Sequence, residues 1–186
     1  METGSSINTI RTDNGGEYNG KDLEVWLKEK GIKHETSVPR TPEQNGVAER
    51  LNRTILECSR SILHSSNLYT EMWTEATSCA VYILNCVYSK SAPAKKTPYE
   101  LWTGRKPSLA HLRIFGSNVF VHVPKEERSK FEPKSIKCIH VGYSETQKAF
   151  RVFDPVARKV RVSRDVIFVE DTTPTRLLDG GNSVPN

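Results

Sequence analysis

The spacing of apolar residues changes near residue 105, and this change is the strongest constraint on the fold. Before it, apolar residues recur at helical intervals, as at Val47, Leu51 and Ile55. After it, short segments alternate apolar and polar residues, with turn residues roughly every eight to twelve positions. The sequence therefore predicts an α/β region followed by a small all-β barrel. The expected strands of the barrel are residues 117–124, 135–144, 149–155 and 158–170.

The α/β region is expected to run strand, helix, strand and then two helices. Residues 7–13 and 32–38 have the β-branched residues of short strands, and residues 22–31 between them place Leu23, Trp26 and Leu27 on one helical stripe. Asp22 is expected to cap that helix. The two later helices are expected over residues 46–62 and about 70–89, with Trp73 facing a core. We place the domains at residues 1–104 and 105–172, followed by a disordered tail at 173–186.

The basic character of the chain lies in its C-terminal part. Residues 1–104 hold 12 Lys and Arg against 13 Asp and Glu, whereas residues 105–186 hold 15 against 9. Such a bias suits contact with a phosphate backbone, and a solvated basic surface is an equally open alternative. Lys159 and Arg161 share one face of an expected strand, with Arg158 and Arg164 nearby. The aromatic residues expected in the core, rather than as platforms for bases, are Phe115, Phe120, Phe150, Phe153 and Phe168.

Several other classes of protein are disfavoured by the composition. No apolar run approaches the roughly 18 residues needed to cross a membrane. The first ten residues lack the basic and apolar regions of a signal peptide, so a nuclear or cytosolic protein is the default expectation. The four cysteines and five histidines are scattered without the paired spacing of a zinc site. Reduced cysteines in a core are the simplest interpretation.

Two carboxylates could form part of a metal site. Asp13 ends an expected strand before the loop Asn14-Gly15-Gly16, and Glu49 begins a helix, with 35 residues between the two acids. A strand-end Asp and a helix-borne Glu can converge, and hard oxygen ligands suit magnesium or manganese better than zinc. The alternative is two unrelated surface acids, because a chain with 22 acidic residues contains many such pairs.

The residues around the two acids favour the first interpretation. The segments RTDNGGEY and TPEQNGVAERLNRT, which contain Asp13 and Glu49, together resemble the integrase of copia-type LTR retrotransposons. The resemblance continues through MWTEATSCAVYILN, TPYELWTGRKPSLAHLRIFGSNVFVHVP and VGYSETQKAFRVFDP, so it covers roughly residues 10 to 170. It implies a ribonuclease-H-like catalytic core in the first domain and a retroviral-polymerase SH3-like domain in the second. It also implies DNA integration by phosphoryl transfer.

The resemblance implies roles for individual residues. Asp13 and Glu49 match the second and third of the family's three catalytic, metal-binding acids, which would hold Mg²⁺ or Mn²⁺. The expected partners are DNA, both element ends and target, and other integrase protomers. The positions expected to bind DNA are Asn14, Asn45, Arg50, Asn52, Arg53, Lys159 and Arg161. For Arg53, an ion pair with Glu49 one helical turn away is a compatible alternative.

The chain departs from the family at its first acid. Only twelve residues precede Asp13, and none of them is Asp. We therefore expect a truncated core that lacks its first strands, binds the metal weakly and cannot join DNA by itself. The alternative interpretations are a non-catalytic nucleic-acid-binding or assembly module, and the product of a degenerate element.

Overall fold

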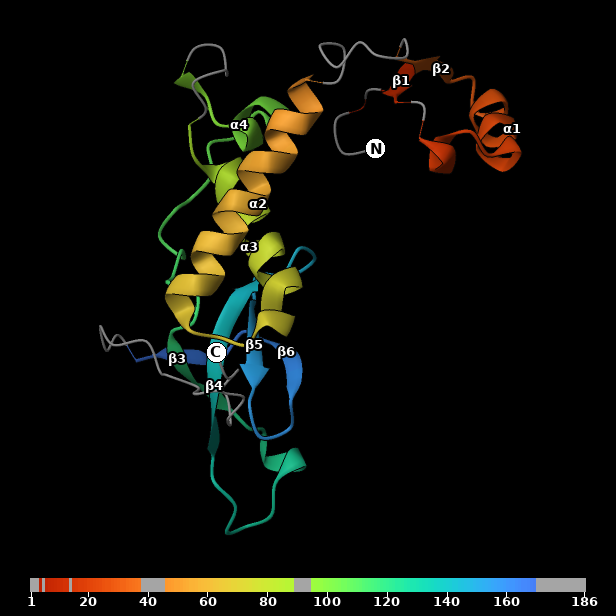
Figure 1. Ribbon diagram of the computed structural model, residues 1–186. Helices are drawn as coiled ribbons and strands as arrows, with labels where there is room; N and C mark the ends of the chain where they lie inside the picture. Colours follow the sequence, from red (N-terminus) through yellow and green to blue (C-terminus); the bar gives the residue numbers. More distant parts are fainter. Residues whose placement is uncertain (1–3, 5, 14, 38–45, 89–94, 170–186) are drawn as a thin grey trace, which may run out of the picture. The chain divides into compact units, whose positions relative to one another are not determined.

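The computed structural model describes residues 4, 6–13, 15–37, 46–88 and 95–169. They belong to two compact units, residues 1–54 and residues 55–186 (Figure 1). The expected disordered tail at 173–186 lies outside the described residues. The domain boundary expected after residue 104 stays a prediction.

The first unit has the predicted order of strand, helix and strand. Strand β1 (Thr9–Thr12) pairs in parallel with β2 (Lys33–Thr36), and α1 (Lys21–Glu29) connects them after a short 3₁₀ turn, η1 (Gly16–Tyr18). Parallel pairing requires such a crossover, because the second strand must start at the same end as the first.

The details of α1 correct two expectations. Its N-cap is Gly20, and no side chain caps the helix, so Asp22 is a first-turn acid and not the cap. Leu27 is buried at 2% exposure, whereas Trp26 on the same expected stripe is 48% exposed. The helix stops at Gly31, whose φ of +67° is accessible to glycine at little cost.

Helix α2 (Gly46–Ser66) carries an apolar stripe that is covered only over its second half. Val47 and Leu51 are 75% and 55% exposed, whereas Ile55, Cys58 and Ile62 are partly buried. Helical periodicity thus placed the stripe correctly, but it did not reveal which part of the stripe a neighbour would cover.

The next elements are η3 (Thr70–Met72), α3 (Trp73–Cys86) and a short helix, α4 (Pro98–Thr103), that was expected to be part of a connector. Helix α4 has both ends defined. At its N-terminus, the Thr97 hydroxyl accepts a hydrogen bond from the Glu100 amide at 3.1 Å, and Pro98 occupies the first turn. At its C-terminus, Gly104 ends the helix with φ +72°.

The second unit contains a five-stranded antiparallel sheet in the order β6-β5-β4-β3-β7. The segment expected to be one long strand, residues 158–170, instead forms two short strands at opposite edges. Strand β6 pairs with β5, whereas β7 crosses to pair with β3. The strands are β3 (Asn118–His122), β4 (Ser135–Tyr143), β5 (Phe150–Asp154), β6 (Lys159–Ser163) and β7 (Val166–Phe168), with η5 (Lys125–Glu127) between β3 and β4.

The buried side chains of the sheet in the second unit belong to two apolar clusters. In the first, α3 lies along the sheet and its buried Ala76 and Cys79 join Ile139, Val141 and Phe153 (Figure 1). The second cluster consists of Val119, Val121, Cys138 and Val152, with further partly buried residues around it. Helix α3 is therefore part of the core of the second unit.

Polar contacts fix the connector between α4 and β3 to the rest of the second unit. The Tyr82 hydroxyl lies 2.6 Å from His111 Nε2, and the Tyr82 ring stacks on Tyr143. The Tyr143 hydroxyl accepts the Arg113 amide at 2.8 Å. Gly116 has φ +87° and lies so close to α2 that a Cβ would come within 2.6 Å of Ser66 Cβ, so this position requires glycine.

Candidate metal and nucleic-acid site

Asp13 lies immediately after β1 with an exposed carboxylate. Its Oδ1 accepts the Gly15 amide at 3.0 Å, which is the local turn typical of Asp before glycine. Among the described residues it forms no ion pair, and the guanidinium of Arg11 on β1 binds Glu35 Oε2 at 2.9 Å. Lys33 binds the other oxygen of Glu35 at 2.8 Å, and hydrogen bonds from Lys33 and Arg11 lower the pKa of Glu35 to about 2. Asp13 is thus left available to a ligand.

Glu49 lies in the first turn of α2 and is also exposed. The side chains of Arg50, Asn52 and Arg53 on the same helix are exposed as well. No ion pair joins Glu49 and Arg53 within the described part of α2, so the alternative role of Arg53 as a partner of Glu49 has no support in this structure. A first-turn acid is favourable at the positive end of a helix.

The convergence of Asp13 and Glu49 stays a prediction. The chain between them includes residues 38–45, which lie outside the described residues together with Asn14, and the expected DNA contact Asn45 falls among them. Within the described ranges, no three His, Cys, Asp or Glu side chains gather so as to hold a metal ion. The donor chemistry nevertheless fits, because both side chains offer exposed carboxylate oxygens of the kind that Mg²⁺ and Mn²⁺ bind.

The two basic candidates on β6 differ in their surroundings. The side chain of Arg161 lies 3.4 Å from Asp154 Oδ2, and it therefore stabilises the hairpin between β5 and β6. Asp154 Oδ1 in turn accepts the amides of Val156 and Ala157 at 3.0 and 2.9 Å. Lys159 is exposed and forms no ion pair among the described residues. Lys159 is therefore the freer of the two for contact with phosphate.

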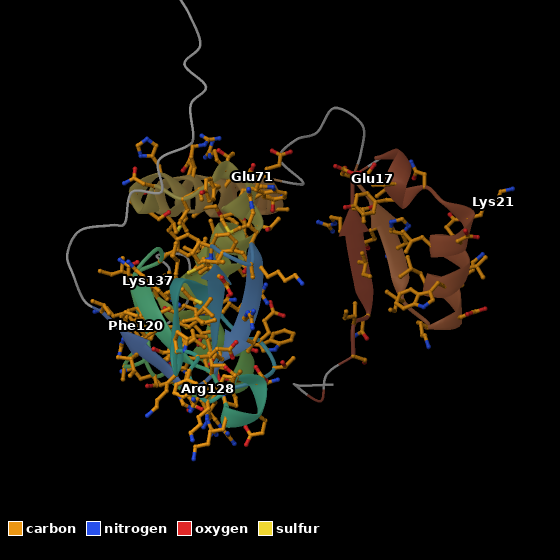
Figure 2. The ribbon with its side chains drawn as sticks, turned by 90° about the horizontal axis from the view of Figure 1, so that it is seen from below. Glu17, Lys21, Glu71, Phe120, Arg128 and Lys137 are labelled. Atoms are coloured by element: carbon orange, nitrogen blue, oxygen red, sulfur yellow. The ribbon has the colours of Figure 1, made fainter. Side chains whose placement is uncertain are left out.

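Two aromatic residues that were expected in the core are on the surface. Phe120 is 38% exposed and lies opposite Lys137 on β4 and Ile167 on β7 (Figure 2). Trp73, at the first position of α3, is 57% exposed. The prediction for Phe120 was wrong, because side chains alternate along β3 and the buried face is the one that carries Val119 and Val121.

Sequence reasoning missed the surface of α4, which lies in a basic segment. Tyr99 and Trp102 are 42% and 62% exposed, and they lie three residues, about one helical turn, apart on α4. The signal for this helix was present in the sequence, because Thr-Pro at positions 97 and 98 and glycine at 104 are typical helix boundaries.

Sequence comparison shows that the chain is similar to parts of transposon polyproteins. Residues 117–179 match the retroviral polymerase SH3-like domain. Over 175 residues, 94% of this chain, it is 46% identical to the retrovirus-related Pol polyprotein from transposon TNT 1-94 of Nicotiana tabacum. The chain is a relative of retrotransposon Pol polyproteins. It is also 34% identical over 177 residues, 95% of this chain, to the corresponding polyprotein from transposon RE2 of Arabidopsis thaliana. It spans 13% and 12% of the lengths of these two Pol polyproteins.

Solved structures with some similarity include an integrase catalytic core domain and an intasome. The catalytic core domain of BIV integrase is 25% identical, with a TM-score of 0.41 over 53% of this chain and 61% of that chain. A simian T-cell lymphotropic virus intasome in complex with PP2A regulatory subunit B56 gamma is 16% identical, with a TM-score of 0.45 over 86% of this chain and 56% of that chain. Both TM-scores are low, so the assignment depends on the Pol sequence relatives and on the SH3-like match.

The structure and the SH3-like match agree with the fold class expected from the sequence, an α/β region followed by an SH3-like all-β region. The sheet of β3 to β7 lies in the SH3-like match of residues 117–179. In the described residues, no helix has the length and apolar character needed to cross a membrane.

Proposed function

We propose that this chain is the part of a retrotransposon integrase that carries two of the three catalytic acids and the SH3-like domain. The observation that carries the proposal is the 46% identity to a retrotransposon Pol polyprotein over 94% of the chain, which includes the segments around Asp13 and Glu49. The ancestral reaction is the joining of element DNA ends to target DNA by phosphoryl transfer.

In this proposal the chain's own residues hold the cations and position DNA. Asp13 and Glu49 offer carboxylate oxygens, and the exposed Arg50, Asn52 and Arg53 on α2 bind the phosphates and bases beside them. When bound, the divalent cation activates the attacking oxygen and stabilises the leaving oxygen.

The SH3-like region supplies a second, basic contact. Lys159 on β6 is exposed, and Lys137 on β4 extends from the sheet beside Phe120 (Figure 2). Duplex DNA carries about one negative charge per 1.7 Å, so a few such cations give salt-dependent binding without sequence preference. In the full assembly, other integrase protomers are the expected protein partners.

The 186 residues supply two acids, and the proposal requires a third from a longer polypeptide. We expect the isolated chain to show no strand transfer with Mn²⁺. A fusion to the segment that precedes the matched region in the tobacco polyprotein should join DNA. Asp13→Ala or Glu49→Ala in that fusion should abolish joining. The matched control is Glu57→Ala, an exposed acid further along α2, which should leave joining unchanged.

The opposite result would support the alternative from another class, a non-catalytic nucleic-acid-binding module. In that case the fusion would bind DNA, and neither Asp13→Ala nor Glu49→Ala would change any activity. Lys159→Ala and Lys137→Ala would then be the substitutions that weaken binding at low salt. Robust joining of DNA by the isolated 186-residue chain would contradict the proposal that a third catalytic acid, outside this chain, is required.

A further inference from the structure

Helix α4 and its flanking residues form a surface in which two exposed aromatic rings lie between two pairs of basic residues. Within residues 95–106 there are four basic residues and one acid, Glu100. Two aromatic side chains, Tyr99 and Trp102, lie on the helix between the basic pairs, and they are 42% and 62% exposed. The four basic residues are all exposed: Lys95, Lys96, Arg105 and Lys106.

The aromatic rings share one face of a helix that is held in place. Residues three apart on a helix are neighbours on its surface, so Tyr99 and Trp102 lie together. The Thr103 hydroxyl donates to the Tyr99 carbonyl at 2.8 Å, and the Gly104 amide donates to the Glu100 carbonyl at 2.9 Å. Such a rigid support reduces the entropy lost when a ligand binds to the exposed rings.

The same helix is anchored to α3. Helix α4 contacts α3, and burial is the main cause of the raised pKa of Tyr82 on α3. Tyr82 also lies against His111 of the connector. Of the two rings on α4, that of Trp102 is the more exposed.

The cations beside these rings are not neutralised by the described residues. None of the four forms an ion pair among them, in contrast to Arg151 and Arg161, which bind Glu75 and Asp154. A surface with a net charge of three and exposed rings is complementary to a ligand that combines anionic groups with flat aromatic faces. Unpaired nucleotides have this chemistry, because every base offers a face for stacking and every phosphate a charge.

We propose that α4 and its flanking basic residues bind unpaired nucleotides, with a base stacked on Trp102 and the flanking phosphates bound by Lys95, Lys96, Arg105 and Lys106. This inference deepens the proposed role in DNA joining and rests on it, since it adds a contact for single-stranded ends to the acids and to the basic sheet. Duplex DNA would engage the cations only, because its bases are stacked on one another.

The test uses the intrinsic fluorescence of one tryptophan. The chain has Trp26, Trp73 and Trp102. In the double variant Trp26→Phe, Trp73→Phe, only Trp102 remains, and we expect an oligothymidine of about 20 nucleotides to quench it at low salt, with the quenching lost as salt is added. A duplex of the same length should quench it far less.

Trp73 provides a matched control. It is 57% exposed, close to the value for Trp102, but its neighbours in sequence are the acids Glu71 and Glu75 instead of cations. In the variant Trp26→Phe, Trp102→Phe, the remaining Trp73 should not respond to the oligonucleotide. Trp102→Ala should weaken binding of a labelled oligothymidine by about 5- to 150-fold, the range for loss of one stacked base.

Three results would overturn the inference. One is an unchanged Trp102 signal while labelled DNA still binds the chain, which would leave the proposed function intact. A second is equal quenching by duplex and single strands. The third is quenching by an acidic peptide such as polyglutamate but not by DNA, which would identify a protein partner. No binding of either DNA form by the whole chain would contradict this inference and the DNA-binding role together.

Discussion

The two units differ in how much buried side-chain area supports their strands. In residues 1–54, the two parallel strands and α1 bury Leu27 and Ser37 among the described residues. In the second unit, five strands pack two apolar clusters and are covered in part by α3. A two-stranded sheet is marginal by itself, whereas three or more strands with an apolar face are self-supporting.

Because of this difference, the residues that stabilise the fold and the proposed metal-binding acid Asp13 lie in different units. The acid Asp13 lies on the thinly packed unit, where its carboxylate is exposed and free to bind a ligand. The aromatic surface of α4 lies on the well-packed unit, where α3 and the connector hold it in place. Substitutions in the core should therefore affect stability mainly through the second unit, and those at Asp13 should affect binding only.

The largest effect should come from the core of the sheet. Phe153 is 2% exposed between β4 and α3, and Phe153→Ala should reduce the free energy of unfolding by about 3–5 kcal/mol, because it leaves a cavity in a packed cluster. Urea unfolding followed by circular dichroism measures this change. The exposed Phe120→Ala is the control and should cost much less; equal effects would show that the two faces of the sheet are packed alike.

The next effect depends on pH. His140 is fully buried, and burial, with a smaller contribution from Arg113, lowers its pKa from 6.5 to about 4. Between pH 6.5 and 4 the imidazole is therefore protonated in the unfolded chain but not in the folded one. The contribution of His140 to the free energy of unfolding is fully present above pH 6.5 and is lost as the pH falls from 6.5 towards 4. The loss should reach about 3 kcal/mol by linkage.

His140→Phe provides the control for this prediction. The variant has no group that titrates at position 140. The phenyl ring would still contact the rings of Tyr143, Phe150 and Phe168, as the imidazole does. Its urea midpoint should therefore change less than that of the unmodified chain between pH 6.5 and 4. The same slope in both proteins would assign the pH dependence to other groups.

A smaller effect should come from the ion pair between α3 and β5. Arg151 donates two hydrogen bonds to Glu75, at 2.7 and 2.6 Å, and the Glu75 side chain is only 13% exposed. Glu75→Gln should lower the free energy of unfolding by about 1.5–3 kcal/mol. Glu71→Gln, at an exposed acid on η3 just before α3, is the matched control, and an equal loss in both variants would indicate a general effect of charge near the start of α3 instead of this contact.

The smallest effect should come from the ion pairs of the first unit. Glu35 binds both Arg11 and Lys33 on the exposed surface of β1 and β2. Glu35→Gln should not shift the urea midpoint measurably, because salt and solvent screen exposed pairs. A clear shift at 0.15 M salt would show that these pairs compensate for the small core of this unit.

Local patterns predicted most of the elements. The strand, helix, strand order of the first unit and the helices α2 and α3 were identified from periodicity, with ends that differ by a few residues. The division of residues 158–170 into β6 and β7 was missed, because Arg164 and Asp165 interrupt the strand without glycine or proline. Which edge a short strand joins is decided by distant partners, which a local pattern does not contain.

The candidate site was predicted less completely. Asp13 and Glu49 were proposed from the specific motifs around them, and their role stays a prediction. The strand that carries Lys159 and Arg161 was expected from the alternating pattern and is β6. Sequence patterns missed the surface of α4 and the exposure of Phe120 and Trp73, since periodicity identifies which residues share a face but not whether another element covers that face.

The most direct test of the account is whether Asp13 and Glu49 bind one and the same cation. In an isotope-labelled chain, Mn²⁺ should broaden the amide signals of Gly15 and of Glu49 and Arg50 at the same concentrations, because a bound paramagnetic ion affects all nuclei near it. Asp13→Ala should remove the broadening at both places. Broadening at one place only, or at each place independently of the other acid, would contradict the account.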